Sequence, residues 1–141
     1  ILAGRRLNNQ MGSWIVKEVI KEMIIKKINV GTSKVLIMGF TFKENCPDIR
    51  NTKVIDVVNG LSEYYIKYDV FDPLANKDET LKEYEITLLK GKPQFSDYSA
   101  IIIAVKHQNF YSYDWKSISK LDIILFDVKG FLEKDIDAIR L

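Results

Sequence analysis

Hydrophobic and polar positions along this chain alternate between two patterns, which predict helices and buried strands in turn. The first pattern fills residues 7–28, where charged residues form one stripe at helical spacing and apolar residues cover the rest. The stripe consists of Lys17, Glu18, Lys21, Glu22 and Lys26. So wide an apolar surface predicts a helix that either lies in the core of its own domain or packs on two sides, with another domain or subunit on the second.

After a turn at residues 28–34, continuous apolar runs alternate with shorter helical patterns. The strands that this predicts are residues 34–40, 67–72, 85–89, 100–106 and 123–129. The predicted helices are residues 52–65, with Tyr65 on the apolar face, 77–84 and 115–121, and a closing helical turn at 131–137. Strands without polar alternation are typical of a parallel sheet covered on both faces. We therefore expect an α/β fold, a doubly wound parallel sheet preceded by a long helix.

Length and charge narrow the class of protein. A chain of 141 residues with 47% hydrophobic and 28% charged residues suits one folded domain. We place the one boundary near residue 30, between the leading helix (1–30) and the sheet domain (31–141). Twenty-one basic residues against nineteen acidic ones give a net charge of +2. This balance gives no electrostatic reason to expect nucleic acid or an anionic membrane as a partner.

The lack of a recognisable signal peptide or membrane-spanning run, together with a single cysteine, predicts a cytoplasmic protein. No apolar run approaches the roughly 20 residues that a membrane-spanning helix needs, and the opening residues are too charged for a signal peptide. Cys46 is the single cysteine, which excludes an internal disulfide and a cysteine-rich metal site. We expect no metal.

Charged residues gather where the predicted strands end. The segments FKENCPDIRNT, DPLANKD, KHQNF and DVKG each follow a strand, and ligands of such sheets bind beyond the carboxyl ends of the strands. The lysines there predict an anionic ligand, and phosphate is the natural candidate. A helix N-terminus near Thr52, with Asn51 or Thr52 as its N-cap, would add unpaired N–H groups. Any single lysine taken alone is more often a solvated turn residue.

Glycine-rich phosphate-binding motifs do not occur in this sequence: it contains neither GxGxxG nor GxxxxGK. If a nucleotide binds, side chains such as Lys43 and Arg50 must contact its phosphates, the lysine as a point charge and the arginine with two parallel bonds. Asp72, at the end of its strand, would either hold a ribose hydroxyl or start an Asp-Pro turn, and we favour the turn.

Neither the cysteine nor the histidine is expected to be catalytic. A nucleophilic cysteine needs a base and an oxyanion site, and nothing in the sequence places His107, the only histidine, beside Cys46. We interpret His107 as a loop residue rather than a general base, on the ligand side of the sheet.

Four motifs together resemble a known family. GRRLNNQMG, GFTFKENCPDIRNTKV, YDVFDP and LFDVKG follow one another along essentially the whole chain. They resemble the C-terminal part of the UDP-glucose/GDP-mannose dehydrogenase family, and ENCPDIRNTKV with GRR resembles its UDP-N-acetylhexosamine (GlcNAc, GalNAc or ManNAc) 6-dehydrogenase branch. The resemblance implies that residues 1–30 end a central linker helix that makes the homodimer contact. Residues 31–141 would then form a Rossmann-like UDP-sugar-binding domain.

The resemblance also implies an activity. The family uses two NAD to oxidise the sugar C6 alcohol of a UDP-sugar to a carboxylate, in the biosynthesis of capsule and other surface polysaccharides. Its catalytic Cys, in a GGxC motif, and its catalytic Lys and Asp lie upstream of these residues, so Cys46 is not their counterpart and this chain alone is expected to be inactive. The alternative is a stand-alone nucleotide-binding or dimerisation module without catalysis.

Five site residues follow from the resemblance. Phe42 and Lys43 match a Phe-Lys pair that contacts the UDP-sugar. Lys129 falls where many UDP-glucose members have an Arg that faces the substrate, so we expect a single charged contact there in place of a bidentate one. Arg50 matches the Arg that reaches the NAD pyrophosphate, and Asp48 matches the acid that orients it.

Overall fold

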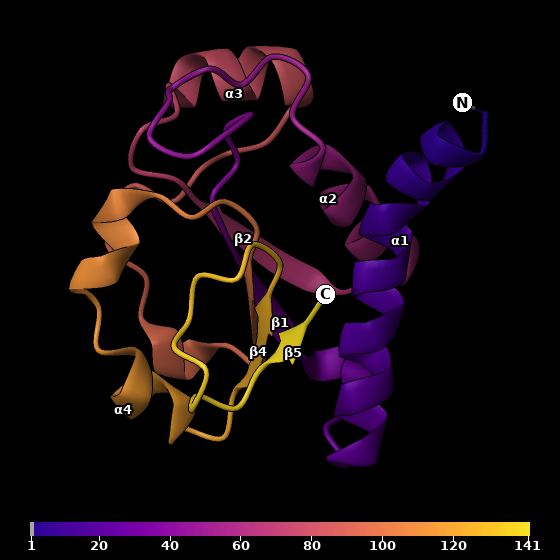
Figure 1. The fold of residues 1–141 in the computed structure, drawn as a ribbon, viewed down its shortest axis with the longest axis vertical. Coiled ribbons are helices and arrows are strands. Elements are labelled where there is room, and N and C mark those ends of the chain that lie inside the picture. Colours follow the sequence, from indigo (N-terminus) through magenta and orange to yellow (C-terminus); the bar gives the residue numbers. More distant parts are fainter. Residues whose placement is uncertain (1) are drawn as a thin grey trace.

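A five-stranded parallel sheet forms the centre of the protein (Figure 1). The computed structural model describes the backbone of residues 2–141 and the side chains from residue 10 onward. The strand order is β2-β1-β3-β4-β5. The strands are β1 (Lys34–Met38), β2 (Lys67–Phe71), β3 (Ala100–Ile103), β4 (Ile124–Asp127) and β5 (Ile139–Arg140). The α/β prediction is confirmed; β5, only two residues long, was not predicted.

In the part of the chain that the structure describes, four α-helices and three short 3₁₀ turns surround the sheet. The helices are α1 (Leu2–Ile25), α2 (Val54–Glu63), α3 (Lys77–Tyr84) and α4 (Trp115–Ser119), and the 3₁₀ turns are Val30–Thr32, Phe95–Asp97 and Gln108–Ser112. The leading helix therefore begins earlier and ends earlier than the pattern predicted. Helix α2 also ends two residues early, so Tyr65 lies beyond it with a positive φ of 57° and is 90% exposed rather than on an apolar face.

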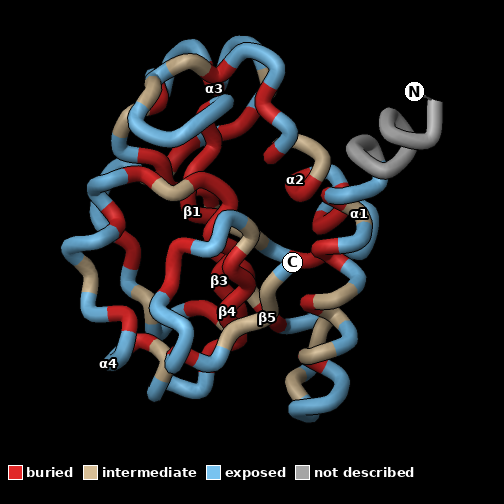
Figure 2. The backbone as a smooth tube through the Cα atoms, viewed as in Figure 1, coloured by how far each residue is buried: buried red, intermediate tan, exposed pale blue. Residues whose placement is uncertain are grey.

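Each face of the sheet has its own hydrophobic core. The buried segments run through the middle of the molecule (Figure 2). Val35 and Ile37 of β1 point to the face covered by α1 and α2. Their neighbours Leu36 and Met38 point to the opposite face, which is covered by α4, the Gln108–Ser112 turn and the closing segment. Because both faces are buried, β1, β3 and β4 have no polar alternation, which is why they appear in the sequence as continuous apolar runs.

One side of helix α1 packs into the core that it shares with α2. Ile15, Val16, Val19 and Met23 are buried in the same cluster as α2 and the sheet. The two helices approach closely at glycine, since a Cβ added to Gly12 would lie 2.5 Å from the Cβ of Asp56. The outer side of α1 is apolar and exposed in part, with Met11, Trp14, Ile24 and Ile25 between 38% and 64% exposed.

Two predicted elements are wrong. Residues 85–89 form no strand: Glu85, with a φ of 59°, caps the end of α3, and Leu89 donates one backbone hydrogen bond to the carbonyl of Val70 (2.9 Å). Residues 131–137 form turns instead of a helix, because the N–H groups of Phe131 and Leu132 bond to the Asp127 carboxylate. Within the described residues, no helix is long and apolar enough to span a membrane.

The end of β1 requires a glycine. Gly39 has a φ of 95°, and a Cβ on it would lie 2.5 Å from the Cβ of Val105, in the loop after β3. The close approach brings the loops that follow β1 and β3 together at the carboxyl edge of the sheet.

Candidate functional site

A pocket of about 310 Å³ opens over the carboxyl ends of β1, β3 and β4. The chain leaves β1 toward β2 on one side and leaves β3 toward β4 on the other, so the pocket lies at the point where the strand order reverses. In open α/β sheets this is the usual place for a ligand. The lining comes from the loop after β1 (41–44), the start of α2, the ends of β3 and β4 and the α1 residues Met11, Gly12 and Ile15.

Three lysines stand around this pocket. Lys43 follows β1, Lys129 follows β4, and Lys53 directly precedes α2. All three are exposed, and among the described residues none of them has a carboxylate within ion-pair distance. Phe42, 56% exposed, lies beside them over a floor of aliphatic side chains. The structure thus brings Phe42, Lys43 and Lys129 together, and adds Lys53, which the sequence did not single out.

Arg50 and Asp48 lie on the same loop but outside the pocket lining. They form a bidentate pair, with Arg50 Nε to Asp48 Oδ1 and Arg50 Nη2 to Asp48 Oδ2 both at 3.0 Å. The hydrogen bonds from Arg50 lower the pKa of Asp48 to about 2. The Arg50 side chain is 85% exposed, so its remaining N–H groups face solvent.

The start of α2 differs slightly from the prediction. The helix begins at Val54, and its N-cap residue is Lys53, whose side chain makes no capping hydrogen bond. Thr52 Oγ1 instead accepts the N–H of Val54 at 3.2 Å, while Asn51 has a positive φ of 60° and precedes the helix.

A buried carboxylate, Asp72, ties the end of β2 to the loop after β1. Its Oδ2 accepts the N–H groups of Phe40 (2.7 Å) and Thr41 (3.1 Å). Its Oδ1 accepts those of Leu74 (2.8 Å) and Ala75 (3.0 Å), which confirms the turn interpretation of the Asp-Pro pair. Being 1% exposed and saturated with backbone donors, the carboxylate stabilises the loops rather than facing the pocket.

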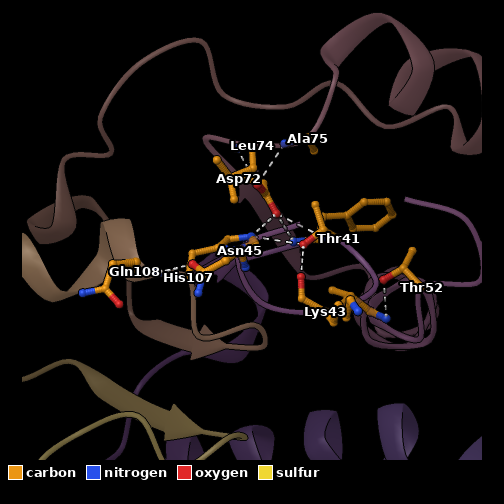
Figure 3. Close-up of polar contacts among 11 residues, drawn as sticks. Thr41, Lys43, Asn45, Thr52, Asp72, Leu74, Ala75, His107 and Gln108 are labelled. Carbon is orange, nitrogen blue, oxygen red and sulfur yellow. Dashed lines mark hydrogen bonds and ion pairs between the residues drawn. The ribbon is translucent and has the colours of Figure 1, made fainter. Parts of the chain in front are cut away.

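His107 joins the same network (Figure 3). Its ring is fully buried, with Nε2 2.9 Å from Asp72 Oδ2 and 3.1 Å from Thr41 Oγ1. Its Nδ1 accepts the N–H of Asn45 at 3.0 Å. His107 is therefore a loop residue as expected, but one with a structural network that the sequence did not reveal.

A second buried aspartate shapes the loop of Lys129. Asp127, the last residue of β4, accepts the N–H groups of Phe131 and Leu132, both at 2.8 Å, and an Arg140 Nη1–H at 3.0 Å. Gly130 turns the chain with a φ of 70°. Asp72 and Asp127 share a sequence signal that could have indicated them: each is an aspartate at the carboxyl end of a strand, Asp127 as its last residue and Asp72 directly after it. In the described part of the chain, no group of three or more His, Cys, Asp or Glu residues could hold a metal ion.

The fold and the cation-rimmed pocket define a Rossmann-like α/β domain with a candidate ligand site at its switch point. Residues 36–134 match the UDP binding domain of the UDP-glucose/GDP-mannose dehydrogenase family. The chain belongs to this family, as its motifs predicted.

Named relatives agree with this assignment. The chain is 46% identical to a UDP-N-acetyl-D-glucosamine 6-dehydrogenase of Pseudomonas aeruginosa and 49% identical to one of Salmonella typhi, in each case over 100% of this chain and 34% of the relative. It is 38% identical to the protein CapL of Staphylococcus aureus, over 96% of this chain and 32% of that one. The chain thus spans about a third of the length of the curated relatives it matches.

Solved structures share the fold. An NDP-N-acetyl-D-galactosaminuronic acid dehydrogenase from Methanosarcina mazei Go1 superimposes with a TM-score of 0.81 over 99% of this chain and 30% of that one, at 15% identity. A UDP-D-ManNAc dehydrogenase from Pyrococcus horikoshii gives a TM-score of 0.73 over 96% and 32%, at 18% identity. At these identities the likeness concerns the fold alone.

Proposed function

We propose that this chain is the UDP-sugar-binding domain of an NAD-dependent UDP-N-acetylhexosamine 6-dehydrogenase, a cytoplasmic enzyme of capsule or other surface polysaccharide biosynthesis. The observation that carries the proposal is the convergence of Phe42, Lys43 and Lys129 on one pocket at the switch point. The sequence identity of this chain to two UDP-N-acetyl-D-glucosamine 6-dehydrogenases, 46% and 49%, also supports the proposal.

The pocket suits a nucleoside diphosphate for physical reasons. Lys43 and Lys129 approach it from loops that follow two different strands, so a diphosphate between them would meet a positive charge on each side. The N-terminus of α2 lies in the same wall and adds the partial positive charge of the helix dipole. Phe42 and the aliphatic floor would take the flatter, less polar parts of the UDP-sugar.

Arg50 and Asp48 fit a second anion, the pyrophosphate of NAD. Asp48 occupies one edge of the guanidinium and fixes its plane, and the remaining N–H groups stay available to a phosphate. In the whole enzyme NAD would accept hydride from the sugar C6. Within this chain the two residues would only bind and orient it, and the chain by itself would be inactive.

A homodimer through α1 completes the proposal. The helix buries one side in its own domain and leaves Met11, Trp14, Ile24 and Ile25 partly exposed on the other. The same face also favours the alternative of a dimerisation module.

Titration of the chain with UDP and UDP-GlcNAc tests the binding role. We expect weak binding by wild type, and each of Lys43→Ala and Lys129→Ala to weaken it about tenfold through loss of one charge-assisted contact. Lys120→Ala is the matched control, because this exposed lysine lies between α4 and β4, at the amino edge of the sheet. Calorimetry gives the affinities, and unchanged binding by Lys43→Ala would remove the role assigned to Lys43.

A further inference from the structure

We propose that His107 is a positioning residue for the loop that carries Phe42 and Lys43. The inference rests on the proposed function for its ligand, a UDP-sugar. The claim that the buried His107 ring fixes the shape of the exposed loop does not depend on the ligand.

The loop that carries Phe42 and Lys43 buries few of its own side chains. Residues 42–45 are all exposed, while the segment is closed at its base by Phe42 N–H donating to the Asp48 carbonyl (2.7 Å). Tyr84 Oη–H fixes the far end by donating to the carbonyl of Ile49 (2.6 Å). The conformation of the tip therefore depends on polar contacts more than on packing.

One imidazole ring supplies those contacts on both sides of Lys43. The N–H of Asn45 is a donor, so His107 Nδ1 is the acceptor and the neutral ring carries its proton on Nε2. That proton faces Asp72 Oδ2 (2.9 Å) and Thr41 Oγ1 (3.1 Å). Thr41 Oγ1 then donates to the carbonyl of Lys43 itself at 2.9 Å. Thr41 and Asn45, the residues that bracket Lys43 at a spacing of two, are both bonded to the same ring (Figure 3).

A second bond reinforces this connection. Asn45, which has a positive φ of 58°, accepts the N–H of Gln108 on its Oδ1 at 2.8 Å. The loop after β1 and the loop after β3 are thus joined by two reciprocal hydrogen bonds, Asn45 to His107 and Gln108 to Asn45. A loop ordered before binding costs less entropy when the ligand arrives, so losing these bonds should weaken UDP binding.

Two replacements of His107 separate positioning from simple packing. His107→Asn keeps an acceptor near the position of Nδ1, whereas His107→Leu fills the site without one. Asp72 retains its four backbone N–H donors in either variant. We expect His107→Leu to weaken UDP binding about tenfold and His107→Asn to restore most of it, because one acceptor decides whether Asn45 is held.

The amide exchange rate of Asn45, measured by NMR, is the readout that does not depend on a ligand. We expect it to rise in His107→Leu while the amides of β1 and β3 stay protected, and to remain slow in His107→Asn. If wild type binds no UDP, the proposed function fails. The exchange rates would still decide whether His107 holds the loop at Asn45.

Asn45→Gly provides a second route should His107→Leu not fold. It changes an exposed residue, accepts the positive φ and removes only the bond from Gln108, so we expect a loss of affinity of about threefold. Unchanged UDP affinity in this variant, or in a folded His107→Leu whose Asn45 amide stays protected, would overturn the inference.

Discussion

At the residue scale, Asp72 shows how one buried carboxylate organises the loops at the carboxyl edge of the sheet. Burial raises the pKa of Asp72, but the hydrogen bond from His107 and the N–H groups of Phe40 and Leu74 outweigh it, so the pKa lies below its ordinary value of 3.8. Because the pKa of Asp72 is lower in the folded than in the unfolded protein, the ionised carboxylate stabilises the fold. This stabilisation is fully present above the ordinary pKa of 3.8, and it is lost as the pH falls through the lower pKa of the folded state.

Asp72→Asn tests this at neutral and acidic pH. The amide nitrogen cannot accept N–H donors, so we expect the variant to lose about 3 kcal/mol of unfolding free energy near neutral pH. The difference from wild type should shrink toward about pH 3, because wild-type Asp72 is then losing its own contribution. Urea denaturation at the two pH values gives both numbers. A difference that does not change with pH would mean that the charge of Asp72 contributes nothing.

At the scale of elements, the contact between α1 and α2 shapes one wall of the pocket. Gly12 lies at this contact and also lines the pocket, and a Cβ there would meet Asp56 Cβ at 2.5 Å and Val57 N at 2.8 Å. Backbone atoms cannot move aside as the end of a flexible side chain can. The separation of the two helices is therefore set by the absence of a side chain at this position.

The substitution Gly12→Ala has two opposite effects on stability: it raises helix propensity, and it disturbs the packing of α1 against α2. In an exposed helix the change would stabilise by about 1 kcal/mol. Here we expect a net loss of about 2 kcal/mol, since the added methyl group must push α1 away from α2. Lys17→Ala, an exposed position in the same helix, is the control and should be nearly neutral. Thermal unfolding measures both, and a stabilised Gly12→Ala would show that the helices separate at no cost.

At the scale of the whole molecule, one apolar surface of α1 stays partly exposed among the described residues. Gln10, Met11 and Trp14 form an apolar hollow with Leu141 at the other end of the sequence. Trp14 is 41% exposed, although its ring contacts Phe126 edge to face at 6.0 Å between centroids. Such a surface is consistent with the proposed dimer, in which a second copy would cover it.

Trp14→Glu should reduce self-association. A carboxylate placed in an apolar contact must be desolvated, so we expect the dimer to weaken at least about tenfold. Tyr65→Asn is the control, because it removes an aromatic ring that is 90% exposed elsewhere and asparagine tolerates its positive φ. Sedimentation over a range of concentrations reports the change. A wild-type chain that stays monomeric at high concentration would contradict the proposed dimer.

The sequence by itself determined the architecture and the family. Strands β1, β3 and β4 lie within continuous apolar runs, because they are buried on both faces, whereas β2 was recognised from the mixed segment KYDVFD. Strand β5 was missed because two residues carry no period. Residues 85–89 have the composition of a strand, yet Leu89 makes only one ladder bond to Val70. Local composition cannot say whether an edge segment continues the pairing.

Only the tertiary structure decided how the site is held together. Asn45 and His107 bond across 62 residues of sequence, and Asp72 reaches Phe40 across 32. No local pattern encodes such contacts, because they exist only once parallel strands place the loops after β1, β2 and β3 at one edge. The same placement puts Lys53 beside Lys43 and Lys129, and leaves the Arg50–Asp48 pair outside the pocket lining. Residue types revealed the chemistry available at the edge, and the sheet determined which residues meet.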